Sequence, residues 1–297
     1  MGERETAKER VAYWAYRGME RAAMGLPESL GRRTFAAAGR LAFRTLDGVR
    51  KTVAANQAQV LGTSPDSALA RVATREAFEL YARYWYDAFR IRALSRSEMN
   101  ARTQMNGVER IDRALGAGHG CIVALPHMGN WDVAGHYLAV NGYRIAAVAE
   151  ELRPRRLFEL FLHHREELGM RIVALAKGEN VGHQLARLLA DNWVVALVAD
   201  RDLSGRGVEV EMFGATRKLP AGPARLSLSM GAPLLICAAY TLEEGWRIEI
   251  SEPIELERSG VMREDVVALT RLLAREFERG IAARPVDWHM FQPAWDR

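Results

Sequence analysis

The residues best placed to do chemistry form one short run, PHMGNWD at residues 126–132, in which a histidine and an aspartate stand five positions apart. The apolar run Cys121–Leu125 before it predicts a buried strand, and residues 133–140 after it have helical spacing. His127 is therefore expected at the carboxyl end of a strand, where open α/β sheets bind their ligands. An imidazole in that place can take a proton from a hydroxyl group, while a carboxylate holds its other nitrogen in one tautomer.

The other residues of the run suit the same reaction. We expect Asp132, in the first helical turn, to orient His127 and to stabilise the imidazolium. Gly129 lets the backbone approach a substrate closely, and the N–H groups of the helix N-terminus can stabilise an oxyanion. Asn130 and Trp131 are expected to contact the substrate. The same spacing also fits an aspartate that only caps a helix beside a strand-end histidine, because such pairs arise by chance.

A second apolar strand, residues 194–199, also ends in charged residues, which are Asp200, Arg201 and Asp202. If this strand lies beside the His127 strand, the Asp200 carboxylate can reach the imidazole and complete a charge relay. Alternatively, Asp200 pairs with Arg201 or forms a turn, and Asp202 competes with it for the place beside the histidine. The sequence leaves these alternatives open.

Two acidic residues, Glu150 and Glu151, end the strand that follows the His127 helix, and Arg165 lies on the next predicted helix. A carboxylate–guanidinium pair at this place can bind the headgroup of an acceptor or simply brace the site. The chain has no glycine-rich nucleotide loop and no Gly-x-Ser-x-Gly sequence around a nucleophilic serine. Nucleophilic catalysis through a serine therefore has no candidate residue, and direct transfer of a group to a hydroxyl fits better.

The remaining histidines and the cysteines are predicted to have no chemical role. His163, His164 and His183 have no spacing that would recruit a metal together with His127, so no metal ligand is predicted. Both cysteines lie in apolar runs and are expected to be small core residues, which suits a reducing cytoplasm.

The sequence around His127 resembles the signature of one branch of the lysophospholipid acyltransferase superfamily. This branch contains the late acyltransferases of lipid A and the phosphatidylinositol mannoside acyltransferases of actinobacteria. The resemblance extends over most of the chain and includes residues 207–214, 219–226 and 231–234, Arg50 and Asn56, residues 81–85, and residues 285–288. Residues 198–204 and the lack of an amino-terminal membrane span are more similar to the mannoside enzymes.

This resemblance implies an O-acyltransferase that moves a long acyl chain from acyl-CoA to a mannose hydroxyl of a phosphatidylinositol mannoside. Acyl-CoA is its co-substrate, and no further cofactor is expected. His127 would be the general base, supported by Asp132 and Asp200. The contacts to substrate would come from Gly129, Asn130, Trp131, Glu150, Arg165, Arg201 and Asp202. The alternatives are a lipid A-type acyltransferase that uses acyl-carrier protein, a lipid-binding protein without activity, and an acyl-CoA hydrolase.

The bulk properties fit a globular protein that acts at a membrane surface. The 297 residues are 49% hydrophobic and 26% charged, with a formal net charge of +4. Arginine clusters at residues 32–33, 153–156 and 201–218 attract anions. We expect an anionic membrane as the partner and no nucleic acid, since no nucleic-acid-binding motif accompanies these clusters.

The same properties bear on where the protein is found. No stretch is long and apolar enough to span a bilayer, and the charged amino terminus does not fit a signal peptide. Peripheral binding at the cytoplasmic face of the plasma membrane is therefore expected. Residues 11–24 mix aromatic residues with arginines, which fits either an interfacial helix or an ordinary packing helix.

Periodicity predicts an α/β fold with a helical front part. The pattern is helical up to residue 107, and from Cys121 short strands alternate with helices, which predicts a mainly parallel or mixed sheet flanked by helices. Strands are expected at residues 144–149, 171–176, 193–199, 233–240 and 246–250, and helices at residues 154–168, 181–190, 220–230 and 261–282. No linker separates the two parts. We therefore expect a single acyltransferase domain, with residues 1–107 as a helical N-terminal part and residues 108–297 as the α/β catalytic part.

Overall fold

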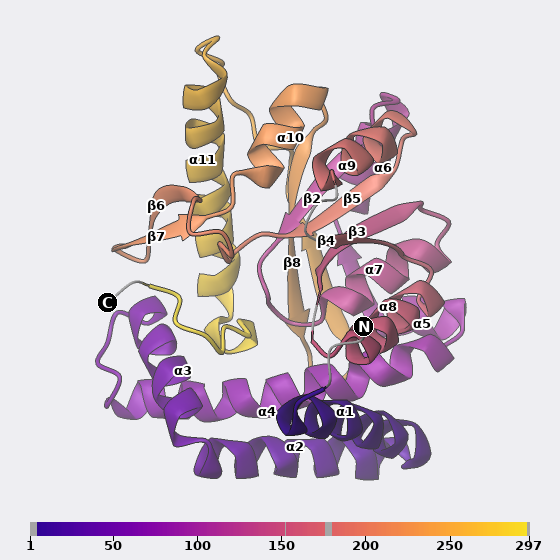
Figure 1. Ribbon diagram of the computed structural model, residues 1–297, viewed down its shortest axis with the longest axis vertical. Helices are drawn as coiled ribbons and strands as arrows, with labels where there is room; N and C mark the ends of the chain where they lie inside the picture. The colour runs from indigo at the N-terminus through magenta and orange to yellow at the C-terminus, as the bar shows by residue number, and fades with distance from the viewer. Residues whose placement is uncertain (1–4, 152, 176–179, 296–297) are drawn as a thin grey trace.

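A seven-stranded sheet forms the centre of the protein, with helices on both of its faces (Figure 1). The computed structural model describes residues 5–151, 153–175 and 180–295, so predictions for residues 1–4 and 176 lie outside the described residues. In sheet order the strands are β1 (Thr103–Asn106), β9 (Trp246–Ile250), β8 (Leu234–Thr241), β2 (Cys121–Leu125), β5 (Val194–Val198), β3 (Ile145–Glu150) and β4 (Arg171–Leu175). β8 and β9 are antiparallel, and the other neighbouring pairs are parallel. The predicted mainly parallel or mixed sheet is confirmed.

The two faces of the sheet carry separate apolar cores. On one face, α9 (Val181–Ala190), α10 (Gly222–Met230) and α11 (Met262–Ala283) bury their apolar side chains against β2, β5 and β8. On the other face, α6 (Val108–Gly116) and α7 (Trp131–Val140) do the same. This arrangement explains why the central strands are apolar at nearly every position: a parallel strand covered on both faces has no solvated side.

The predicted helical front part is confirmed. It consists of α1 (Ala7–Gly25), α2 (Glu28–Thr45), α3 (Asp47–Val60), α4 (Ala68–Arg90), η1 (Ile91–Ala93) and α5 (Arg96–Arg102). In Figure 1 the first four helices lie below the sheet. α4 crosses the end where the active-site candidates lie, since Arg83 donates to the Leu242 carbonyl just after β8 over 2.6 Å. The front part therefore closes one side of the predicted site.

Three strands were not predicted from periodicity. β1 has only four residues and a polar composition, so it lacks an apolar pattern, yet it pairs in parallel with β9. β6 (Val208–Met212) and β7 (Ala215–Leu219) form a separate antiparallel hairpin. Its turn residues Phe213 and Gly214 both have positive φ angles, 52° and 71°, as a tight two-residue hairpin turn requires. This hairpin covers Asp200, because Arg217 of β7 donates to the Asp200 backbone carbonyl.

Candidate active site

His127 and Asp200 form a hydrogen-bonded pair at the carboxyl ends of two neighbouring parallel strands. β2 and β5 are paired so that Leu125 lies opposite Val198. Each polar residue follows two positions later, so the strand register brings the two side chains together. Nδ1 of His127 lies 2.5 Å from Oδ1 of Asp200, and the backbone amide of His127 donates to Oδ2 over 3.0 Å. The predicted approach of Asp200 to the imidazole is confirmed.

The Asp200 carboxylate is ionised although it is fully buried. Burial by itself raises the pKa of this group, but the charge of His127, hydrogen bonds from His127 and Trp288, and the charge of Arg217 together hold the pKa of Asp200 at about 2. Trp288 Nε1 donates to Oδ2 over 2.8 Å. A carboxylate at Nδ1 keeps the proton on that nitrogen, which leaves Nε2 of His127 as the proton acceptor. The His127 side chain is 30% exposed, so a substrate can reach it.

Asp132 has other partners than its spacing predicted. Its buried carboxylate accepts hydrogen bonds from Oη of Tyr84 over 2.8 Å and from Nε of Arg165 over 2.9 Å. Within the described ranges, neither of its oxygens is hydrogen-bonded to His127. The expectation that Asp132 orients His127 directly is therefore wrong. The reason is tertiary: α4 and α8 (Arg155–Glu167) bring a phenol and a guanidinium to the first turn of α7.

Gly129 and Asn130 hold the loop between β2 and α7. A Cβ atom on Gly129 would lie 2.1 Å from the Ala239 carbonyl oxygen, so the close approach that needs glycine is to β8 and not to a substrate. Asn130 is buried, and its Oδ1 accepts from the Val133 amide over 3.1 Å as the cap of α7. The structure shows this structural role for both residues, and their expected contact with substrate stays a prediction.

Arg201 forms an ion pair with Glu150. Its Nη2 donates to Oε2 of Glu150 over 2.7 Å, and its Nη1 donates to Oε1 of Gln292 over 2.7 Å. Asp200 therefore does not pair with Arg201. The guanidinium that meets Glu150 comes from the neighbouring strand end, whereas Arg165, expected near Glu150, binds Asp132.

Asp202 shapes the loop that leads to the β6–β7 hairpin. Its carboxylate accepts from the Ser204 amide over 2.9 Å and from the Gly207 amide over 2.6 Å. Burial raises the pKa of this carboxyl group, but these hydrogen bonds and the charge of Lys218 lower it below the ordinary value. Asp202 is therefore a turn-forming aspartate, and the structure decides in favour of Asp200 as the partner of His127.

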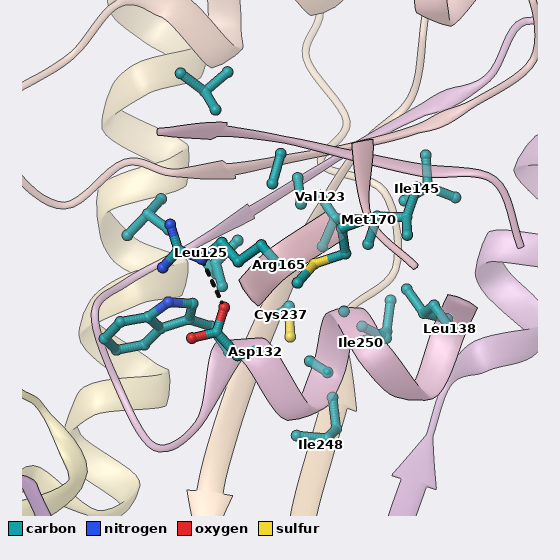
Figure 2. Close-up of a pocket in the computed structure, with 18 of the residues that line it drawn as sticks. Val123, Leu125, Asp132, Leu138, Ile145, Arg165, Met170, Cys237, Ile248 and Ile250 are labelled. Carbon is teal, nitrogen blue, oxygen red and sulfur yellow. Dashed lines mark hydrogen bonds and ion pairs between the residues drawn. The ribbon is translucent and has the colours of Figure 1, made fainter. Parts of the chain in front are cut away.

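Three hollows meet at Trp131 and Arg165, which line all of them. The first is an apolar cavity between the sheet and α7, with the Asp132–Arg165 ion pair at its polar end (Figure 2). The second, of about 590 Å³, lies on the α9 and α10 side and includes His127, Arg201 and Arg225 in its lining. The third, of about 310 Å³, also includes His127. Its walls are mainly aromatic and come from Tyr81, Tyr84, Trp85, Trp131, Phe158, Phe161, His289 and Phe291.

The apolar cavity is produced by small side chains on the inner face of the sheet. Ala196 and Val198 of β5 line it and keep accessible surface, although the alternate residues Val195 and Leu197 are buried against the other face. Ala147 of β3 lines the same space. A central strand with accessible side chains on one face indicates a space that opens to solvent beside the active-site candidates.

Comparison with known proteins agrees with this geometry. The profile of a family described as bacterial lipid A biosynthesis acyltransferase matches residues 3–297. The chain belongs to this family. It is 37% identical over 285 residues to the phosphatidylinositol mannoside acyltransferase of Mycobacterium tuberculosis, an alignment that covers 95% of this chain and 88% of the relative. It is 36% identical over 271 residues to the protein of the same name from Mycolicibacterium smegmatis, covering 91% and 86%. The resemblance predicted from the sequence is confirmed.

Two general features of this acyltransferase concern the described residues as a whole. None of the helices found there combines the length and the apolar character that crossing a membrane requires. No group of three or more His, Cys, Asp or Glu side chains in this part of the chain could hold a metal ion.

The candidate site also contains residues that were not predicted from the sequence. The segment after α11 runs along the His127 loop, and the His289 amide donates to the His127 carbonyl over 2.7 Å. Nε2 of His289 donates to the Gly129 carbonyl over 3.0 Å, and burial lowers the pKa of His289 to about 3, so its imidazole is neutral. Trp288 lies in a run that resembles the family, but nothing in that run indicates that its indole reaches Asp200. Tyr84 lies in another such run, residues 81–85, and Arg217 lies in the arginine cluster at residues 201–218, but neither pattern indicates a contact with an aspartate of the site.

Proposed function

We propose that this acyltransferase moves a long acyl chain from acyl-CoA to a mannose hydroxyl of a phosphatidylinositol mannoside at a membrane surface. The observation that carries the proposal is the His127–Asp200 pair, because it presents a supported general base to two pockets at once. The names of the mycobacterial relatives support the choice of acceptor. The absence of a nucleophilic serine in an elbow sequence supports direct transfer.

The reaction needs a single base. Nε2 of His127 takes the proton of the sugar hydroxyl while the oxygen attacks the thioester carbonyl carbon. The Asp200 carboxylate stabilises the imidazolium, and the first-turn amides of α7 offer hydrogen bonds to the oxyanion. The tetrahedral intermediate then loses the thiolate, and the imidazolium returns its proton to sulfur. The products are a sugar ester and free coenzyme A, and His127 regains its starting state.

The three pockets suit the sugar ring of the acceptor, the hydrocarbon chain of the acyl group and the phosphates of coenzyme A. The aromatic pocket offers flat apolar faces for a sugar ring, and the polar groups of Glu150, Arg201 and Gln292 lie in its lining. The apolar cavity, of about 60 Å³, excludes water from part of a hydrocarbon chain. The larger pocket includes Arg201 and Arg225, whose charges suit the phosphates of coenzyme A.

The proposal is tested by incubating purified protein with labelled palmitoyl-CoA and a panel of glycolipids, and by analysing the lipid product. We expect the label on a phosphatidylinositol mannoside in the wild type. His127→Ala should lower this rate roughly 10²–10⁴-fold, because the base is removed. His119→Ala, at an exposed histidine outside the site, is the matched control and should transfer at the wild-type rate.

Other outcomes would contradict the proposal in distinguishable ways. Transfer from acyl-carrier protein alone would indicate a lipid A-type donor. Release of coenzyme A without glycolipid, with free fatty acid as the product, would indicate a hydrolase. Lipid binding without turnover would indicate a binding protein. Wild-type turnover by His127→Ala would reject the mechanism.

A further inference from the structure

A buried arginine, Arg217, contacts the backbone of Asp200. Arg217 is on β7 of the hairpin, is 4% exposed, and donates from Nη2 to the backbone carbonyl of Asp200. Its guanidinium carbon lies 5.6 Å from the ring centroid of Trp288 and 5.4 Å from that of Trp295. The hairpin thus places a cation beside two indole rings, one of which donates to the Asp200 carboxylate.

Arg217 is unusual because no carboxylate neutralises it through an ion pair among the described residues. Its Nε and Nη1 atoms are buried and have no hydrogen-bond partner there. Burial lowers the pKa of Arg217 below its ordinary value, and the nearby charge of Asp200 opposes that fall. An arginine keeps its charge in proteins, and an unpaired buried charge is costly. Its retention at this place suggests that the charge acts on the Asp200 carboxylate.

We propose that Arg217 is a positioning residue for the His127–Asp200 pair. Through the Asp200 carbonyl and the Trp288 ring it fixes the carboxylate at Nδ1 of His127. Its charge also stabilises the ionised Asp200 carboxylate, so its removal should change the pH at which the pair takes up a proton. The inference rests on the proposed function, since it assigns His127 the task of accepting a proton.

The other charged and titratable groups around the pair do not replace this charge. Arg201 follows Asp200 in the chain but is directed to Glu150 and Gln292. His289 faces His127 from the C-terminal segment and is neutral. Arg217, from the hairpin, is the buried cation that lowers the pKa of Asp200.

Substitutions at Arg217 test this role by the pH dependence of kcat/KM for acyl transfer. Arg217→Met keeps an apolar stem beside the two indoles but removes the charge. The acid limb of the pH profile of kcat/KM should therefore move up by roughly one pH unit. Arg217→Lys keeps the charge and should restore most of the wild-type profile. Lys218→Met removes the same charge from the exposed face of the hairpin, where solvent screens it, and should leave the acid limb in place. An unmoved limb in folded Arg217→Met would overturn the proposal.

A measurement on the wild type covers the case in which Arg217→Met does not fold. In NMR spectra, the Nε–H resonance of Arg217 should shift with pH, with the same midpoint as the imidazole signals of His127, because the charge that the pair gains changes the field at the guanidinium. A resonance that ignores that titration would overturn the proposal. This measurement needs no substrate. A protein that couples Arg217 to His127 but transfers no acyl group would contradict the proposed function and leave the coupling intact.

Discussion

At the scale of single residues, two buried aspartates near His127 have different tasks. Asp200 contacts the imidazole, whereas Asp132 contacts Tyr84 and Arg165. Sequence spacing favoured Asp132, because it is close to His127 in the chain. Substitution of each aspartate by asparagine should separate a role in catalysis from a role in stability.

Asp200→Asn should lower kcat roughly 10²–10⁴-fold while the protein keeps its fold, because the amide no longer stabilises the imidazolium or fixes its tautomer. Asp132→Asn leaves the partly buried Arg165 without a counter-charge and should lower the free energy of unfolding by about 2 kcal/mol. Steady-state kinetics and denaturant titration of both variants provide the comparison. Near-normal rates in Asp200→Asn, with His127→Ala inactive, would leave Asp200 with a structural role only.

His289 predicts a pH dependence of stability. Its pKa is about 3 in the folded protein, because burial disfavours the charged form, and about 6.5 in an unfolded chain. Between these values the unfolded chain binds a proton that the folded chain does not, so the free energy of unfolding falls as the pH drops from 6.5 towards 3. The slope for one proton is about 1.4 kcal/mol per pH unit.

The measurement compares His289→Gln with the wild type from pH 7 to pH 4. The glutamine amide can still donate to the Gly129 carbonyl, so the difference in unfolding free energy isolates the titration of His289. We expect the variant to gain stability relative to the wild type as the pH falls. The comparison is needed because Asp287, whose pKa burial raises to about 6, acts in the opposite direction between pH 6 and 4 in both proteins. His119→Gln serves as the control, and a difference that does not change with pH would contradict the assignment.

At the scale of secondary structure, β2 and β5 decide the geometry of the site. Each delivers one polar residue two positions beyond its last paired residue, and their register makes these residues neighbours. On the sheet face that α7 covers, small side chains of β5 and of its neighbour β3 leave space for the apolar cavity. The strands therefore hold the base and border the space proposed for the acyl chain.

The cavity can be filled from β3 to test what it holds. Ala147→Leu adds three carbons inside it and should lower transfer from palmitoyl-CoA roughly tenfold more than transfer from octanoyl-CoA, because a long chain needs the lost space. Ala186→Leu makes the same change in the larger pocket and is the matched control. Equal loss for both donors in Ala147→Leu, with a chain-length effect in Ala186→Leu, would place the acyl chain in the larger pocket.

At the scale of the whole molecule, the N-terminal helices have an apolar surface that the core does not use. α1 packs through Tyr16 against Trp85 and Phe161, yet Val11 and Trp14 remain 68% and 58% exposed. Leu30 and Leu41 of α2 are also exposed. The two sequence-based interpretations of residues 11–24 are thus compatible, since one side of α1 packs and another exposes apolar side chains, as an interfacial helix would.

We expect the protein to float with anionic vesicles at low salt and to stay behind at high salt, because each basic side chain near such a surface contributes about 1 kcal/mol that salt screens. Trp14→Ser should weaken vesicle binding roughly tenfold, since the variant lacks an apolar side chain that would be buried in the vesicle surface. Val261→Ser changes an exposed apolar residue just before α11. The start of α11 lies on the side of the molecule away from the N-terminal helices in Figure 1, so this variant should bind as the wild type does. Binding that ignores both salt and lipid charge would indicate insertion instead.

The sequence by itself determined the α/β class, the helical front part, the position of His127 at a strand end, and the family. These features depend on local periodicity and on short motifs, which one segment carries alone. The sequence also indicated Asp200 as a candidate, but only on the condition that two strands were neighbours.

Only the tertiary structure decided which carboxylate serves the histidine. His127 and Asp200 are 73 residues apart, and their contact depends on β2 and β5 lying side by side in register. Asp132 is close to His127 in the chain, but its carboxylate is hydrogen-bonded to Tyr84 and Arg165 instead. Trp288 and Arg217 reach Asp200 from distant segments, and nothing local in those segments indicates this contact. Spacing along a chain sets the face on which a side chain lies, whereas strand order and packing decide which side chains from distant segments meet there.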